Sequence, residues 1–75
     1  MPPLAGISGK RALKAFQKLG YQVIRQNGSH VRLKHPDSNN FLPLTLPMHR
    51  ELKVGLLASA LKDAKLTVEQ FLELL

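Results

Sequence analysis

The sequence predicts an α+β fold of two layers, in which helices cover one face of a three-stranded antiparallel sheet. Apolar residues recur at helical spacing near both ends of the chain, and three short segments between them carry strand-like patterns separated by turn residues. The expected order is helix, three strands, helix and a short C-terminal helix. Seventy-five residues suffice for one modest core, so we expect a single domain over residues 1–75.

The first helix is expected between Ser8, a favourable N-cap residue, and Gly20, a favourable residue just past a helix end. One side of this helix is apolar and the other is cationic. The apolar side comprises Ala12, Leu13, Phe16 and Leu19, and the cationic side comprises Lys10, Arg11, Lys14 and Lys18. The helix is thus expected to bury one stripe and to present a basic surface.

A hairpin is predicted around residues 27–28, because Asn-Gly is the strongest short hairpin signal. Before it, "YQVIRQ" is predicted as a strand whose inward face is ambiguous, since Val23 and Ile24 are adjacent. After it, "HVRLK" alternates, with Val31 and Leu33 directed toward the core. The outward side chains of this strand are His30, Arg32 and Lys34.

The turn-rich segment "HPDSNN" leads into a third predicted strand, "FLPLTL". One face of this strand carries Leu42, Leu44 and Leu46, and the other carries Phe41, Pro43 and Thr45. Pro43 cannot donate a hydrogen bond to a neighbouring strand, which favours an edge position or a bulge. The three strands together predict an antiparallel meander with one face in water.

Two helices are expected after "PMHRELK". The inward face of the first comprises Val54, Leu57, Ala58, Leu61 and Ala64. Residues 67–70, "TVEQ", form a capping box for a last short helix. Its inward residues are expected to be Val68, Phe71, Leu72 and Leu75.

The composition excludes several classes of protein. The chain has no cysteine, which excludes disulfides, a thiolate nucleophile and sulfur-ligated zinc. The longest apolar run, "VGLLASAL", has eight residues and is too short to span a bilayer, and the N-terminus lacks the pattern of a signal peptide. We therefore expect a cytoplasmic protein with no membrane partner.

The net charge of +6 is concentrated in the first half of the chain. Residues 1–36 contain seven bases and no acid, whereas residues 37–75 contain four bases and five acids. A one-sided positive field favours a phosphate backbone or another polyanion as partner. A soluble surface that is merely basic is the alternative, and we favour nucleic acid.

The outward side chains of "HVRLK" form the candidate site. His30, Arg32 and Lys34 stand in a row at intervals of about 6.5–7 Å, comparable with the spacing of phosphates along an extended single strand. The imidazole of His30 can take a proton from a ribose 2′-hydroxyl or give one to a leaving oxygen. Arg32 and Lys34 would stabilise the charge that accumulates on the phosphorus centre.

Residues beside this row extend the candidate site. Gly28 permits a tight turn and close approach of a ligand to the backbone, and Ser29 can offer a hydroxyl or an amide to a phosphate. Lys10 and Lys14, on the cationic side of the first helix, would extend an RNA path. Phe41 is a candidate for stacking on a base, although burial at the sheet edge is the favoured interpretation.

Two alternatives to catalysis stay open at this point. A lone histidine on an exposed strand is commonly only a polar residue, and a noncatalytic nucleic-acid contact would use the same side chains. His35 and His49 lie in turns or loops and share no helix-face or strand-face spacing with His30. The sequence has no metal-ligand cluster, no paired carboxylates and no phosphate-binding glycine loop, so we expect neither a metal site nor a cofactor.

Over nearly its whole length the chain resembles the HicA (YcfA-like) toxins of bacterial toxin–antitoxin systems. The likeness runs through "SGKRALKAFQKLGYQVIRQNGSHVRLKHPD", then "LPMH", then "ELKVGLLASALKDAKLTVEQFLELL". The most informative motif is "GSH" at Gly28, Ser29 and His30, and a Pro-x-His motif also matches at Pro47 and His49. Their order and spacing together are more specific than either motif alone.

The resemblance implies a fold like that of the double-stranded-RNA-binding domain. It also implies an mRNA interferase, an endoribonuclease that cleaves single-stranded messenger RNA and arrests translation, with His30 as the catalytic residue. A HicB-like antitoxin would bind and block the toxin. The other residues of the expected RNA site follow from the strand, turn and helix patterns above and are Gly28, Ser29, Arg32, Lys34, Lys10 and Lys14.

The chain departs from the family in two places. Gly-Thr-Leu at the start of the second helix is here Gly55, Leu56 and Leu57, which removes a natural N-cap residue, and Lys65 replaces a frequent glycine. Leu56 is expected either as an exposed contact for a partner or buried against the preceding loop. We interpret His49 as structural.

The alternative functions are a noncatalytic RNA-binding module and an antitoxin-binding interaction domain. The sequence leaves the RNA sequence preference and the oligomeric state of the free protein open.

Overall fold

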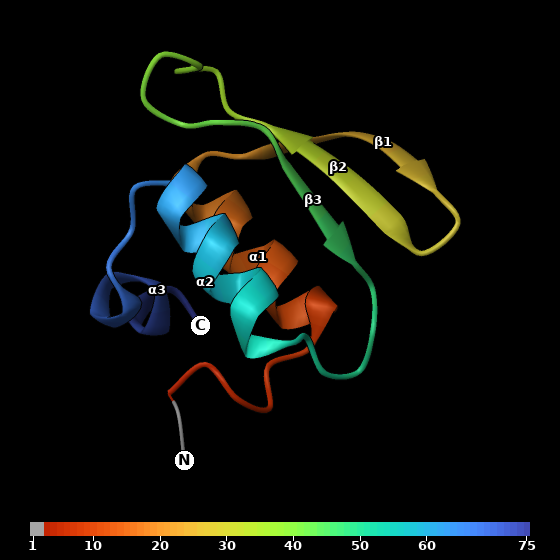
Figure 1. Ribbon diagram of the computed structural model, residues 1–75. Helices are drawn as coiled ribbons and strands as arrows, with labels where there is room; N and C mark the ends of the chain where they lie inside the picture. Colours follow the sequence, from red (N-terminus) through yellow and green to blue (C-terminus); the bar gives the residue numbers. More distant parts are fainter. Residues whose placement is uncertain (1–2) are drawn as a thin grey trace.

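The structure, a computed structural model, describes residues 3–75. Its elements are α1 (Gly9–Leu19), β1 (Gln22–Asn27), β2 (His30–Lys34), β3 (Leu44–Pro47), α2 (Val54–Asp63) and α3 (Val68–Leu74). The strands form one antiparallel sheet in the order β1-β2-β3. The helices lie together on one side of this sheet (Figure 1). The predicted α+β class, with its helix–sheet–helix order like that of a double-stranded-RNA-binding domain, is confirmed.

The ends of α1 are fixed by the two residues that the sequence indicated. The hydroxyl of Ser8 accepts a hydrogen bond from the Arg11 amide at 3.1 Å, which satisfies a donor that the first turn leaves unpaired. Gly20 closes the helix in the left-handed conformation, with φ of 117°. A side chain there would be strained and would also meet the His35 imidazole. Both predicted helix ends are therefore confirmed.

Strands β1 and β2 are joined by a two-residue turn at Gly28 and Ser29. Gly28 has a φ of 61°, a left-handed conformation that favours glycine at this position. Along β2 the predicted alternation holds, with Val31 and Leu33 buried. The sequence left the inward face of β1 ambiguous, and all six residues of β1 are exposed. In Figure 1 the hairpin extends past the helices, which agrees with the exposure of β1.

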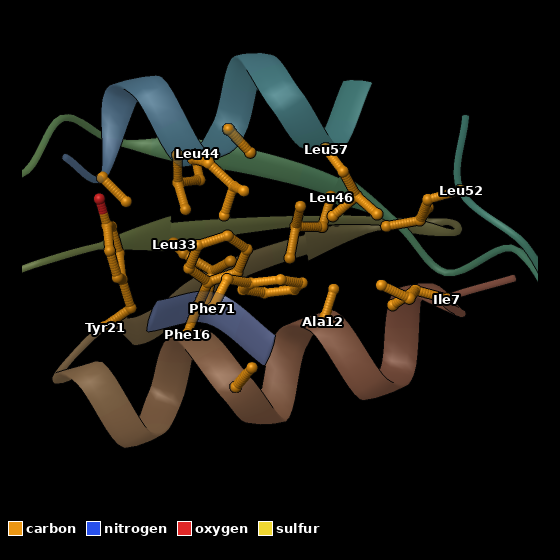
Figure 2. Packing of buried hydrophobic residues seen from close by; sticks show 14 of the residues in the cluster. Ile7, Ala12, Phe16, Tyr21, Leu33, Leu44, Leu46, Leu52, Leu57 and Phe71 are labelled. Atoms are coloured by element: carbon orange, nitrogen blue, oxygen red, sulfur yellow. The ribbon is translucent and has the colours of Figure 1, made fainter. Parts of the chain in front are cut away.

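The core lies between the sheet and the helices. Phe16 of α1 and Phe71 of α3 meet at its centre with ring centroids 5.3 Å apart, next to Leu33 of β2 (Figure 2). At one end, Ile7 and Leu52 pack together, and the Leu52 amide donates to the Ile7 carbonyl at 2.8 Å. The segments before α1 and before α2 are thereby tied to each other.

The predicted inward face of α2 is partly wrong. Leu57, Leu61 and Ala64 are buried as expected, but Val54 and Ala58 are exposed and Ala60 is buried in their place. The sheet and the loop after β3 lie on the side of the helix that carries Leu56 and Ala60. The buried stripe is therefore rotated toward those residues.

The start of α2 also differs from the expectation. The helix begins at Val54, after Lys53, whose side chain makes no capping hydrogen bond. Position 56 therefore lies inside the first turn, where a threonine could not act as N-cap. Leu56 is half-buried against the core, which decides in favour of its burial over full exposure.

Two further residues that were predicted to face the core are exposed. Leu42 is 51% exposed, because β3 begins only at Leu44 and Leu42 stays in the connection before it. Leu72 is 37% exposed, since α3 lies at the outside of the helix layer and buries only Phe71 fully. The predicted capping box of α3 is confirmed: Thr67 and Gln70 exchange hydrogen bonds of 2.9 and 3.1 Å.

Phe41 does not lie on the open face of the sheet. It is half-buried, and its ring stacks on the His35 imidazole with centroids 4.0 Å apart and meets Tyr21 edge-on. His35 also hydrogen-bonds through Nε2 to the Leu19 carbonyl at 3.0 Å and accepts from the Asp37 amide through Nδ1. Phe41 and His35 thus close the end of the core beside α1, and the favoured interpretation of Phe41 as buried is confirmed.

Candidate functional site

The strand alternation that buries Val31 and Leu33 turns the other residues of β2 toward the open face of the sheet. There, His30 pairs with Asn27 of β1 and with Pro47 of β3. Arg32 pairs with Arg25 and Thr45 in the next row. The site is therefore built from all three strands.

A pocket of about 550 Å³ opens on this face, here called the basic pocket. It is lined by Arg25, Gln26, Asn27, His30, Arg32 and Thr45. Arg32 is half-buried and donates from Nη1 to the Thr45 hydroxyl at 2.9 Å, which fixes its guanidinium against β3. The lining holds two arginines and no acid, so its electrostatics favour an anion.

Arg25 is the site residue that the sequence reasoning missed. It stands directly opposite Arg32 in the β1–β2 ladder. Like charges in directly opposed positions destabilise a sheet unless an anion or solvent screens them. The signal was present in the sequence, because a two-residue turn at 28–29 pairs residues 27 with 30 and 25 with 32.

A second pocket, of about 310 Å³, lies where β3 leads into α2 and is here called the loop pocket. Its lining comprises His30, Pro47, His49, Glu51, Leu52, Lys53 and Leu56. His30 lines both pockets and is exposed, so its imidazole is reachable from either one. His49, which the sequence placed in a loop with a structural role, shares this second pocket with it.

The turn before His30 is held by hydrogen bonds to its two backbone carbonyls. The Ser29 carbonyl accepts from the Met48 amide at 2.7 Å, and the Gly28 carbonyl accepts from the Gln26 side chain at 3.0 Å. Within residues 3–75, no atom lies within 4 Å of the position that a Cβ on Gly28 would occupy, so the backbone there is open to a ligand.

All three lysines that were expected to contact RNA lie outside both pockets. Lys34 is exposed at the far end of β2, opposite Gln22, on the same face as His30 and Arg32. Lys10 and Lys14 are exposed on α1, which packs on the other face of the sheet. A path from His30 to Lys10 would have to pass the end of the sheet, where the Gly9 amide donates to the His49 carbonyl at 2.9 Å.

The pKa of Tyr21 departs clearly from its ordinary value. Burial raises the pKa of Tyr21 from 10.0 to about 12, and the negative charge of Asp63 adds to the effect. Its hydroxyl donates to the Leu42 carbonyl at 2.8 Å. Tyr21 lines neither pocket and belongs to the core.

A family model described as the HicA toxin of bacterial toxin–antitoxin systems matches residues 9–66, which span α1 through the end of α2 and include both pockets. The chain belongs to the HicA toxin family. Among curated proteins, no sequence matches it.

Membership makes this HicA chain the toxin of a toxin–antitoxin pair, and an antitoxin is its implied partner. Within residues 3–75, no three His, Cys, Asp or Glu side chains come together in a way that could hold a metal ion. None of the helices in the described part of the chain has the length and apolar character needed to cross a membrane.

Proposed function

We propose that this HicA chain is an mRNA interferase that cleaves single-stranded RNA without a metal ion and uses the imidazole of His30 for proton transfer. The observation that carries the proposal is the position of His30 at the junction of the basic pocket and the loop pocket. A histidine that is exposed there can reach the sugar–phosphate backbone of a bound strand.

The basic pocket supplies the phosphate site. Arg25 and Arg32 face one another across β1 and β2, and a phosphate between them would replace their mutual repulsion with attraction to both. The hydrogen bond from Arg32 to Thr45 holds one guanidinium in place before RNA arrives. Such fixed positive groups stabilise the negative charge that develops on the phosphate oxygens in the transition state.

The remaining proposed contacts extend the strand path in both directions. Lys34 continues the row of β2 beyond Arg32, and Gly28 and Ser29 offer open backbone and a hydroxyl next to His30. Lys10 and Lys14 would contact RNA that passes around the end of the sheet. A HicB-like antitoxin that covered this face would block the site.

The test is cleavage of a long single-stranded RNA by purified protein in EDTA, with the wild type beside His30→Ala. Circular dichroism would establish that both proteins are folded. We expect the wild type to cut and the folded variant to lose about 10²- to 10⁴-fold in rate while still binding RNA. If neither cuts, or both cut equally, His30 is not catalytic and a noncatalytic RNA-binding or antitoxin-binding role is the better account.

A further inference from the structure

The loop pocket contains a second imidazole. His49 and His30 both line this pocket of about 310 Å³, and both side chains are exposed. They come from segments nineteen residues apart, His30 from the start of β2 and His49 from the loop between β3 and α2. Cleavage through a 2′-hydroxyl needs one group to accept a proton and another to donate one, and His30 alone supplies a single group.

The backbone holds the two histidines in a fixed relation. Pro47, two residues before His49, pairs with His30 in the β2–β3 ladder. The Met48 amide donates to the Ser29 carbonyl at 2.7 Å, which ties the residue before His49 to the residue before His30. The Gly9 amide donates to the His49 carbonyl at 2.9 Å and anchors the same loop on α1.

The close packing at Gly9 shows how tightly this loop is seated. A Cβ at Gly9 would overlap with the Pro47 carbonyl oxygen and press on Met48, so the backbone of α1 lies in close contact with the backbone of the loop at this point. A loop fixed at both flanks of His49 needs little ordering when RNA binds. That is the condition under which a catalytic side chain acts efficiently.

We propose that His49 is the second catalytic residue and that His30 and His49 act as an acid–base pair across the loop pocket. The inference rests on the proposed ribonuclease function. One imidazole takes the proton of the 2′-hydroxyl as the 2′-oxygen forms a bond to phosphorus. The other gives a proton to the 5′-oxygen as its bond to phosphorus breaks, which leaves a 2′,3′-cyclic phosphate and a free 5′-hydroxyl.

Other groups around the pair do not replace the second histidine. Glu51 and Lys53 line the loop pocket, and Arg25 and Arg32 line the basic pocket on the other side of His30. Imidazole is the side chain that gives and takes protons in the range between about pH 5 and 8. Arg25 and Arg32 serve the phosphate, and Glu51 and Lys53 have no proton-transfer step in the proposed mechanism.

The experiment compares His49→Ala and His49→Gln with the wild type and His30→Ala. Arg50→Ala is the matched control, since Arg50 is the exposed neighbour of His49 and lines neither pocket. The fold should survive in both His49 variants, because the hydrogen bond to Gly9 uses the His49 backbone. Urea unfolding would verify this. We expect both His49 variants to lose about 10²- to 10⁴-fold in cleavage rate and Arg50→Ala to stay near the wild type.

A second substrate separates proton transfer from mere support of the loop. At a bond that the wild type is found to cut, the 5′-oxygen is replaced by sulfur, a leaving atom that needs no proton. We expect the sulfur to restore cleavage in the variant that lacks the general acid, either a His49 variant or His30→Ala, and not in the other.

Each result bears on one claim. If the wild type cuts in a His30-dependent way while His49→Ala and His49→Gln cut at nearly the same rate, the proposed function stands and the pairing is wrong. The pairing is also wrong if the folded His49 variants are slow and sulfur restores neither them nor His30→Ala. If the wild type does not cut RNA at all, the proposed function fails and the inference falls with it.

Discussion

Replacing Arg25 with glutamine should separate RNA affinity from fold stability. Arg25 is exposed on β1, lines the basic pocket and stands opposite Arg32. Glutamine keeps a long polar side chain and removes only the charge. If the Arg25 guanidinium contacts a phosphate, its loss should weaken RNA binding by about 1 kcal/mol, or roughly fivefold.

The salt dependence of RNA binding gives a more specific prediction for the loss of this charge. One phosphate contact to a single strand contributes about 0.7 to the slope of log affinity against log salt. When the salt is raised from 50 to 200 mM, the fold-loss of RNA affinity should therefore be smaller for the variant than for its parent by a factor of about 2.6. Meanwhile the free energy of unfolding should stay level or rise by about 0.2–1 kcal/mol, because two like charges no longer face each other in the sheet.

Both quantities can be measured in a His30→Ala background, in which the RNA should stay intact. Fluorescence anisotropy of a labelled strand gives affinity and slope, and urea unfolding gives stability. Lys62→Gln is the matched control, since Lys62 is an exposed base on α2 that lines neither pocket. The reasoning is refuted if Arg25→Gln changes affinity and slope no more than Lys62→Gln does, or if it lowers stability while leaving binding intact.

Substitutions at three further positions test the fold that positions the site. Lys65→Gly should raise the free energy of unfolding by about 0.5–1 kcal/mol in urea, because Lys65 has a φ of 53°, whereas Lys65→Ala should bring no such gain. Since burial raises the pKa of Tyr21 from 10.0 to about 12, its buried phenol favours the folded state below pH 10, and that stability should be lost as the pH rises toward 12. Tyr21→Phe should abolish this loss in pH-dependent unfolding and cost about 1 kcal/mol at neutral pH for the bond to Leu42; an unchanged alkaline loss would contradict the assignment. Gly9→Ala should lower the melting temperature and slow RNA cleavage together, because its Cβ would displace Pro47. Unchanged cleavage in a destabilised variant would show that the packing of this loop against α1 does not affect catalysis.

The sequence predicted those features that depend on neighbouring residues. Ser8 and Gly20 mark the ends of α1, and residues 67–70 mark the start of α3, because caps are local hydrogen-bonding devices. The alternation in β2 gave the outward direction of His30 and Arg32 for the same reason. These predictions needed no knowledge of what packs against each element.

The errors arose where tertiary packing decides. Ala60 faces inward and Ala58 outward because of where the sheet and loop lie relative to α2, which its apolar pattern alone does not reveal. Ile24 is left without a pairing partner by a bulge in β1, which the sequence showed only as an ambiguity between two adjacent apolar residues. His49 enters the loop pocket because the Met48 amide reaches Ser29, a contact between segments far apart in the chain.

The core and the candidate site depend on the same alternation of inward and outward side chains along β2. Val31 and Leu33 fill the core only while His30 and Arg32 point to the open face, so a slip of one residue would exchange the two sets. The turn at Gly28 and the hydrogen bond between Ser29 and Met48 oppose such a slip, because they fix the strand at the end where His30 stands. The "GSH" motif therefore has a structural reason beyond its histidine: its first two residues set the register that places the imidazole between the two pockets.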